Sequence, residues 1–243
     1  MKSKFIFPEL IFKCSILSMF VYVMFLSACH TAAPKVTVEE RTVASKTDAW
    51  TVDVQYRVFA SSDEAVNASL ENLNVQLERY VSAMSDSLKV DAEEIFKSFE
   101  ADSLPRPSWG YALNVTDTVY MATSEYVSVR LAVYQFTGGA HGMTNFVAFN
   151  YDVENQKFLE TTDLLDFEKT VAINNLLKEN FENPEQCFDI DPTLDLVSSI
   201  NFSASAAYFT FGHYSLGPYA CGPAEVTVSL KDLGESFLLN VAK

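Results

Sequence analysis

Alternating apolar and polar side chains predict the first strand of the folded part of this chain. Between residues 50 and 58 every second residue is apolar, and the residues between them are polar or charged. A period of two is typical of a half-buried strand. Residues 61–64 have the pattern of a capping box. Behind them apolar residues recur every three or four positions from Val66 to Leu88, which predicts one long amphipathic helix.

The rest of the pattern predicts short strands and helices in irregular order. A second, shorter helix is expected over residues 91–99, and the prolines at 105 and 107 follow it. Strands are predicted over residues 111–121, 126–136, 146–151, 157–159, 201–211 and 224–230. Two further helices are predicted, one from about 166 to 181 with Phe167, Val171, Leu177 and Phe181 on its apolar side, and a short one near 233–241. Because the strands form hairpin-sized groups, the predicted fold is α+β: mostly antiparallel sheets packed with one long N-terminal helix, a mid-chain helix and a short C-terminal helix.

Composition narrows the class of protein. The 243 residues are 49% apolar, and 32 acidic residues against 17 basic ones give a net charge of −15. This chain is too apolar to be disordered and too poor in cysteine to be a disulfide scaffold. A pI near 4.5 argues against a nucleic-acid partner, because few cations are available to neutralise phosphates. The length suits one domain, which we divide provisionally into two lobes, about 49–110 and 111–243.

The first 29 residues have the layout of a secretion signal. A basic start is followed by an apolar run from Cys14 to Leu26. This run is shorter than the roughly 20 residues of a membrane span, and it is typical of a signal peptide over residues 1–28, with an uncleaved anchor as the alternative. The ending Leu26-Ser27-Ala28-Cys29 resembles a bacterial lipobox, which implies lipid (palmitate) on Cys29 and attachment to the membrane. His30 stands where a retention signal would have Asp, so we expect an outer-membrane lipoprotein that faces the periplasm.

Cleavage before Cys29 changes the charge and the number of free cysteines. The signal carries three lysines and one glutamate, a net charge of +2, so the mature chain would be at −17. Residues 29–48 are polar and are interpreted as a tether, which leaves 49–243 as the domain. Cys187 and Cys221 remain, either paired in an oxidising compartment or as two buried thiols.

Glycines are concentrated in the segment Tyr134-Gln-Phe-Thr-Gly138-Gly139-Ala-His141-Gly142. Glycine allows positive φ and close approach of the backbone. The segment lacks the spacing of a phosphate-binding loop, and a strand instead of a helix is predicted after it. A glycine-rich corner with His141 bonded to the local backbone is therefore the simplest interpretation, and a binding surface is the other.

A second dense segment, residues 208–223, combines glycines and prolines with aromatic residues that include Tyr214 and Tyr219. Such a composition predicts a rigid turn between strands. The tyrosines could pack against the core with their hydroxyls bonded, or could form a surface that stacks on a sugar or a partner.

No catalytic group can be chosen from the sequence. His141, His213, Cys187 and Cys221 have none of the spacings of a zinc site, and no nucleophile motif is present. Carboxylates could serve a glycoside hydrolase, but Glu160, Asp163 and Glu225 do not stand out among 32 acidic residues. We therefore expect a non-enzyme with no cofactor and no metal.

The two dense segments together resemble the extracytoplasmic domain of unknown function shared by the anti-sigma factor RsiV and the peptidoglycan deacetylase PdaC. Tyr134 through Gly142 carries the first signature, and Asn201-Phe202 followed by Tyr214 through Gly222 carries the second. Cys221 stands at a position where this family has a small residue, which favours a disulfide with Cys187. The sigma-binding segment and the deacetylase domain have no match here, so we expect neither activity.

The resemblance implies a binding role, because the RsiV domain senses lysozyme by binding it. We expect a cell-envelope lipoprotein that binds a lysozyme-like protein or peptidoglycan through Gly138, Gly139, His141, Gly142, Tyr214 and Tyr219. The acidic charge is suited to a cationic partner. A glycan-acting hydrolase that uses carboxylates and a structural envelope lipoprotein without a ligand are the alternatives.

Overall fold

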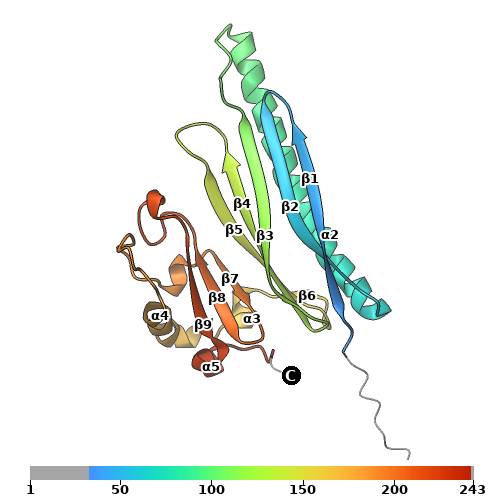
Figure 1. Ribbon diagram of the computed structural model, residues 1–243, viewed down its shortest axis with the longest axis vertical. Helices are drawn as coiled ribbons and strands as arrows, with labels where there is room; N and C mark the ends of the chain where they lie inside the picture. Colours follow the sequence, from blue (N-terminus) through green and yellow to red (C-terminus); the bar gives the residue numbers. More distant parts are fainter. Residues whose placement is uncertain (1–32, 242–243) are drawn as a thin grey trace, which may run out of the picture. The chain divides into compact units, whose positions relative to one another are not determined.

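The computed structural model describes residues 33–241, and the following account concerns that range (Figure 1). The predicted signal peptide, Cys29 and the beginning of the tether lie outside the described residues. No helix within residues 33–241 is long and apolar enough to cross a membrane. The architecture is α+β, as predicted, with a six-stranded sheet, a three-stranded sheet and one long helix.

The larger sheet contains six strands in sequence order. They are β1 (Val36–Lys46), β2 (Trp50–Ser61), β3 (Tyr111–Ala122), β4 (Tyr126–Phe136), β5 (Met143–Asp152) and β6 (Lys157–Phe158). All neighbours are antiparallel except β2 and β3, which are parallel. A parallel pair needs a crossover connection, and α2 (Glu64–Ala101) provides it.

The strand β1 corrects the interpretation of residues 29–48 as a tether. Residues 36–46 pair in antiparallel register with β2 from Val36↔Ser61 to Lys46↔Thr51. Most of their side chains are exposed, which explains why the polar composition was misleading. Strand pairing is a backbone property, so an edge strand can be polar on both faces.

The helix α2 is one element of 38 residues, where the sequence predicted two helices. Leu88, Ala92 and Phe96 are all buried and follow at intervals of four, so the apolar stripe continues past residue 90. The N-cap is Asp63, whose carboxylate accepts a hydrogen bond from the backbone N–H of Val66 at 3.0 Å, and not Ser61.

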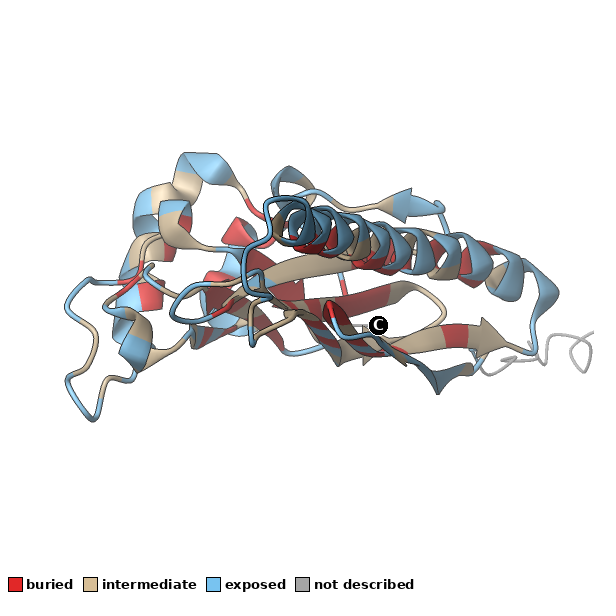
Figure 2. Ribbon diagram, turned by 90° about the horizontal axis from the view of Figure 1, so that it is seen from above, coloured by how far each residue is buried: buried red, intermediate tan, exposed pale blue. Residues whose placement is uncertain are grey.

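The first hydrophobic core lies between α2 and one face of the larger sheet. Figure 2 shows the buried residues of α2 on the side against the strands. Leu70, Leu73 and Leu77 are fully buried there, opposite alternate residues of β2, β3 and β4. Burial of such side chains is the main contribution to stability. The other face of the sheet is left polar over much of its area.

The second core surrounds the antiparallel sheet of β7 (Ser199–Phe202), β8 (Ala206–Phe211) and β9 (Ala224–Ser229). Short helices accompany it: α3 (Thr161–Leu164), α4 (Thr170–Glu179) and α5 (Leu230–Leu233). The single strand predicted over 201–211 is in fact the hairpin β7–β8, because the Ser203 hydroxyl accepts hydrogen bonds from the N–H groups of Ser205 and Ala206 and closes a turn.

Two predicted helices are shorter than expected. Regular helix begins at Thr170, after a 3₁₀ turn over Phe167–Lys169, and it buries Ile173 and Leu177. Phe167 and Val171, which were assigned to its apolar side, are 46% and 76% exposed. At the end of the chain, α5 is followed by a 3₁₀ turn over Gly234–Ser236 instead of a continuous helix.

The two cores divide the domain after β6, near residue 159, and not near residue 110 as the provisional lobes had it. A buried polar seam joins them. The Ser128 hydroxyl of β4 donates to the Asn150 side chain at 2.7 Å and accepts from the Asn201 amide and from the N–H of Phe202, both at 3.0 Å. Both cores belong to one compact unit that begins at Pro34.

Candidate functional site

The glycine-rich segment forms the hairpin loop between β4 and β5, and each of its three glycines has a structural reason. Gly138 and Gly139 have φ of 100° and 91°, and a Cβ at Gly138 would lie 3.0 Å from the Trp109 ring. A Cβ at Gly142 would lie 2.4 Å from a ring carbon of Tyr134. The glycines therefore shape the hairpin, and of the segment's predicted binding residues the side chain of His141 is the chemical group exposed on it.

The loop between β8 and β9, residues 212–223, meets this hairpin through Tyr219. The Tyr219 hydroxyl donates a hydrogen bond to the carbonyl oxygen of Gly142 at 2.9 Å. Its ring stacks on His141, with centroids 3.8 Å apart, and on His213, with centroids 4.4 Å apart. Tyr219 is thus held by one hydrogen bond and by imidazole rings from both loops.

Tyr214 completes what we call the histidine–tyrosine cluster: His141, His213, Tyr214 and Tyr219. Its hydroxyl lies 3.4 Å from Nε2 of His141, and its ring centroid is 5.6 Å from that of Tyr219. The side chain is 54% exposed, and its backbone has φ of 67°, a left-handed conformation that non-glycine residues rarely adopt. A strained backbone that presents a large aromatic side chain to solvent is typical of a functional position.

The structure thus brings His141, Tyr214 and Tyr219 together, although 78 residues separate the first from the last. His213 was considered in the sequence only as a metal ligand, and its place in the stack was missed. Its position beside Tyr214 was the available signal. Its Nδ1 is buried without a hydrogen-bond partner among the described residues.

A disulfide holds the β8–β9 loop from the other side. Cys187 and Cys221 are bonded, with Cα atoms 5.7 Å apart. The backbone of Gly217 also packs against residue 187, where a Cβ would lie 3.2 Å from the carbonyl oxygen. The loop that carries Tyr214 and Tyr219 is therefore fixed to residue 187 at Gly217 and at Cys221, which lowers the entropy cost of binding through the loop.

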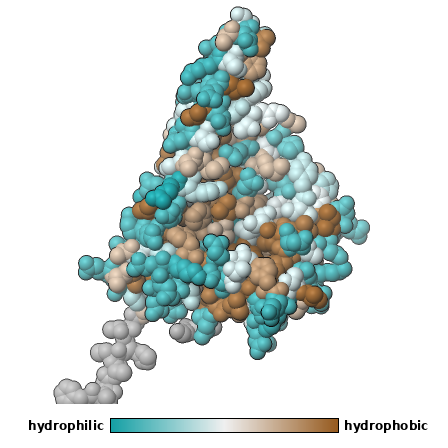
Figure 3. Space-filling view, turned by 180° about the vertical axis from the view of Figure 1, so that it is seen from behind, coloured by the Kyte–Doolittle hydropathy of each residue, from teal (hydrophilic) through white to brown (hydrophobic). Residues whose placement is uncertain are grey.

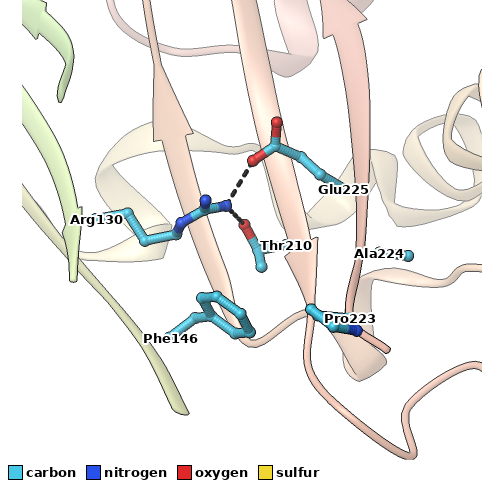
Figure 4. A pocket seen from close by; sticks show the side chains of 6 residues that line it. All are labelled: Arg130, Phe146, Thr210, Pro223, Ala224 and Glu225. Carbon is cyan, nitrogen blue, oxygen red and sulfur yellow. Dashed lines mark hydrogen bonds and ion pairs between the residues drawn. The ribbon is translucent and has the colours of Figure 1, made fainter. Parts of the chain in front are cut away.

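A second candidate site lies where the two sheets meet, in what we call the Arg130 hollow. It has a volume of about 200 Å³ and is lined by Arg130, Phe146, Thr210, Pro223, Ala224 and Glu225 (Figure 4). Nη1 of Arg130 donates to Oε2 of Glu225 at 2.5 Å and to the Thr210 hydroxyl at 2.6 Å. Arg130 comes from β4, whereas Glu225 comes from β9, so this ion pair bridges the two sheets.

Aromatic rings enclose the guanidinium group of Arg130. Its carbon lies 5.1 Å from the ring centroid of Phe146 and 5.4 Å from that of Tyr120. The Tyr120 hydroxyl donates to Oε2 of Glu225 at 2.5 Å. Burial, and then this hydrogen bond, raise the pKa of Tyr120 well above its ordinary range, so the phenol remains the donor.

The three carboxylates considered as catalytic candidates, Glu160, Asp163 and Glu225, do not lie together in the structure. Glu160 and Asp163 are reciprocally bonded at the start of α3, which is a capping role. Glu225 lies on β9 opposite Arg130, so the three do not converge. Arg130 was missed, although it is the one charged residue in the apolar strand 126–136 and that was a usable signal. Within residues 33–241 no group of three or more His, Cys, Asp or Glu is placed to hold a metal ion.

Comparison with known families supports the resemblance drawn from the first of the two motifs. Residues 43–144 match the family model described as "Deacetylase PdaC", and this range contains the Tyr134–Gly142 segment. Over residues 43–144 the prediction of an RsiV/PdaC-type domain is confirmed, and a match of this type suggests an extracytoplasmic location.

Similar proteins cover nearly the whole chain. The immunogenic proteins MPB64 of Mycobacterium bovis and MPT64 of Mycobacterium tuberculosis are each 29% identical over 227 residues, which is 86% of this chain and 91% of theirs. A DUF3298 family structure from Bacteroides fragilis superimposes with a TM-score of 0.61 at 16% identity, over 84% of this chain and 94% of the other. Another, from Pseudomonas aeruginosa, gives 0.51 at 19% identity over 86% and 95%. At these identities the structures establish the fold alone.

Proposed function

We propose that the RsiV/PdaC-type domain of this chain is a non-catalytic binding module, held at the outer membrane by lipid on Cys29. In this proposal the histidine–tyrosine cluster recognises an envelope-directed protein of the lysozyme type, and an envelope glycan is the other candidate ligand. The observation that carries the proposal is the assembly of the cluster. Two segments distant in sequence meet to hold Tyr219 between two imidazole rings and to expose Tyr214.

The strand register supports this role, because the cluster and Val36, where the described chain enters the sheet, lie at opposite ends of the sheet. The chain enters the sheet at Val36, opposite Ser61, whereas the β4–β5 hairpin lies at the other end, where Trp50 pairs with Tyr111 and Ala112 with Phe136 (Figure 1). A strand as long as β2 spans on the order of 40 Å. In this proposal the partner therefore binds at the end of the sheet remote from Val36.

Charge favours a cationic protein as the ligand. The mature chain would have a net charge of −17, which accelerates the encounter with a basic partner. Tyrosine and histidine are suited to the centre of such an interface, since they combine apolar area with a polar tip.

Binding can be tested by calorimetry of the full-length protein in detergent, with lysozyme and with soluble muropeptides as separate probes. We expect saturable heat with lysozyme and at least about tenfold weaker binding for Tyr214→Ala, whose side chain is exposed and makes few structural contacts. Val171→Ala, at a more exposed position on α4, is the matched control and should bind like the unmodified protein. Heat with muropeptides alone would favour the glycan. No heat with either probe, or equal binding by Tyr214→Ala, would exclude the cluster as the binding surface.

Lipid attachment has its own test. Cells labelled with a palmitate analogue should transfer the label to the unmodified protein and not to Cys29→Ser, which should leave the membrane fraction. Label on both proteins would show that Cys29 is not the acylated residue, and Cys14→Ser serves as the control for a nearby thiol.

A further inference from the structure

We propose that the Arg130 hollow, together with the polar face of the six-stranded sheet beside it, binds an uncharged glycan strand, with one sugar ring held in the hollow. This site is distinct from the histidine–tyrosine cluster. The inference therefore does not depend on the ligand proposed for that cluster.

On β3, β4 and β5 the face of the sheet opposite α2 is almost free of charge near the hollow, whereas β2 places Asp53 opposite Asn114 on that face. Cross-strand partners point to the same side of a sheet, and the register aligns Thr118 with Arg130 and Ala148, and Thr116 with Ala132 and Phe146. Asn114 follows on the same side of β3. We call these positions the open face: Asn114, Thr116, Thr118, Arg130, Ala132, Phe146 and Ala148.

The charge on the open face differs from that of the whole molecule. The chain contains 49 charged residues, yet Arg130 is the one charged residue of the open face, and Glu225 neutralises it. Asn114, Thr116 and Thr118 are exposed. Hydroxyl and amide groups both donate and accept hydrogen bonds, as the hydroxyl groups of a sugar do. A neutral, hydroxyl-rich ligand suits this surface better than a cationic or an anionic one.

The hollow itself leaves two nitrogen donors of Arg130, Nε and Nη2, and one acceptor of Glu225 without a partner among the described residues. Arg130 uses Nη1 for its bonds to Glu225 and Thr210, and Glu225 uses Oε2 for its bonds to Arg130 and Tyr120. Nη2 of Arg130 and Oε1 of Glu225 make no hydrogen bond with any of the described residues. Figure 4 shows these two side chains joined directly by their ion pair, with the Phe146 ring beside Arg130. A sugar hydroxyl can satisfy both atoms while the ring packs on Phe146.

The size of the hollow sets how much ligand enters it. Its volume of about 200 Å³ is below the roughly 300–1,000 Å³ of pockets for drug-sized molecules. One sugar ring therefore fills it, and the next units of the strand would lie over Thr116 and Thr118 on the exposed part of β3.

The test is a titration of the full-length protein in detergent with the tetramer of N-acetylglucosamine, followed by calorimetry. We expect saturable binding that Phe146→Ala weakens at least about tenfold. Thr118→Glu adds a charge at an exposed strand position beside Arg130 and should weaken binding to a similar degree. Because Thr118 is exposed and makes no side-chain hydrogen bond with described residues, its variant should keep the melting temperature of the unmodified protein.

The same titrations distinguish the glycan site at the Arg130 hollow from the protein-binding site proposed at the histidine–tyrosine cluster. Tyr214→Ala should bind the tetramer like the unmodified protein, and Phe146→Ala should keep its affinity for lysozyme. Absence of saturable binding, or unchanged binding in both Phe146→Ala and Thr118→Glu, would overturn the glycan site. Loss of tetramer binding in Tyr214→Ala alone would place the sugar at the cluster, which refutes this inference and leaves the proposed function standing.

Discussion

The six-stranded half and the three-stranded half of the domain each bury a core, but they do so by different means. In the first half, one helix of 38 residues covers long strands, and regular periodicity supplies the apolar residues. In the second half, short helices, 3₁₀ turns and a disulfide surround strands of four to six residues. Both candidate sites draw residues from both halves: loops meet at the histidine–tyrosine cluster, and strands of the two sheets meet at the Arg130 hollow.

The hydropathy of the surface reflects this difference. Figure 3 shows hydrophobic and hydrophilic side chains mixed on the face seen from behind. In the second half Phe167, Val171 and Leu238 are 46%, 76% and 52% exposed, as happens where helices are too short to bury a complete apolar stripe. The core under the long helix can be predicted from apolar periodicity. The histidine–tyrosine cluster lies on loops, where no such periodicity exists.

The largest expected effect tests whether the two cores unfold together. Leu77 in α2 and Leu177 in α4 are both fully buried, so Leu77→Ala and Leu177→Ala should each lower the free energy of unfolding by about 2–5 kcal/mol. Both tryptophans lie in the first half, so their fluorescence reports on that half, whereas far-ultraviolet circular dichroism reports on both. We expect the two signals to change together in Leu177→Ala. A fluorescence transition unaffected by Leu177→Ala would show that the halves unfold separately.

Removal of the disulfide should have the second largest effect on the free energy of unfolding, and this effect arises in the second half. The bond closes a loop with a sequence separation of 34, and its loss in Cys187→Ser/Cys221→Ser should cost about 4 kcal/mol through the greater entropy of the unfolded chain. Denaturant unfolding with and without reductant measures this cost. Thiol alkylation followed by mass spectrometry checks the pairing directly, and two labelled cysteines in protein exported to the periplasm would contradict it.

The polar seam around Ser128 should contribute less to the free energy of unfolding than the disulfide does. Ser128→Ala leaves the Asn201 amide and the N–H of Phe202 without the oxygen to which they donate, which should cost about 1–3 kcal/mol. Ser205→Ala, at an exposed turn position, is the control and should be near neutral. If Ser128→Ala were equally neutral, the seam would not join the halves energetically.

The smallest effect concerns pH. The hydrogen bond from Lys157, followed by that from the N–H of Glu160, lowers the pKa of Asp163. A lowered pKa stabilises the fold above the ordinary carboxyl range, and this contribution disappears as the pH falls through the lowered value. Lys157→Ala should raise the pKa of Asp163 towards its ordinary value, as measured by NMR titration of the carboxyl carbon. Lys178→Ala, which removes the cation beside Asp191 instead, should leave it unchanged.

The sequence predicted the regular half of the fold best. Residues 126–136 form a strand with the predicted bounds, and the long helix was identified from its apolar spacing. The break expected at residue 90 was wrong, because the apolar stripe continues through Ala92 and Phe96. The strand over 36–46 was missed, since backbone pairing with β2 leaves no trace in its side chains.

The part of the candidate site that is built from residues of the two sequence motifs was predictable. His141, Tyr214 and Tyr219 were selected from composition and resemblance, and the structure joins them. His213 and the Arg130–Glu225 pair were not selected, because their contacts are made across different elements far apart in the chain. Such pairings depend on tertiary register, which periodicity within one segment does not contain.

The position of β1 at the edge of its sheet has a consequence for solubility. Its outer side presents unpaired backbone groups that could extend the sheet with a second molecule, and no other described strand covers it. The middle of the strand carries Glu39, Glu40 and Arg41. Antiparallel self-pairing centred on Glu39 or on Arg41 would place two like charges opposite each other, which is unfavourable. The charges that made this segment resemble a tether thus also discourage neighbouring molecules from joining edge to edge.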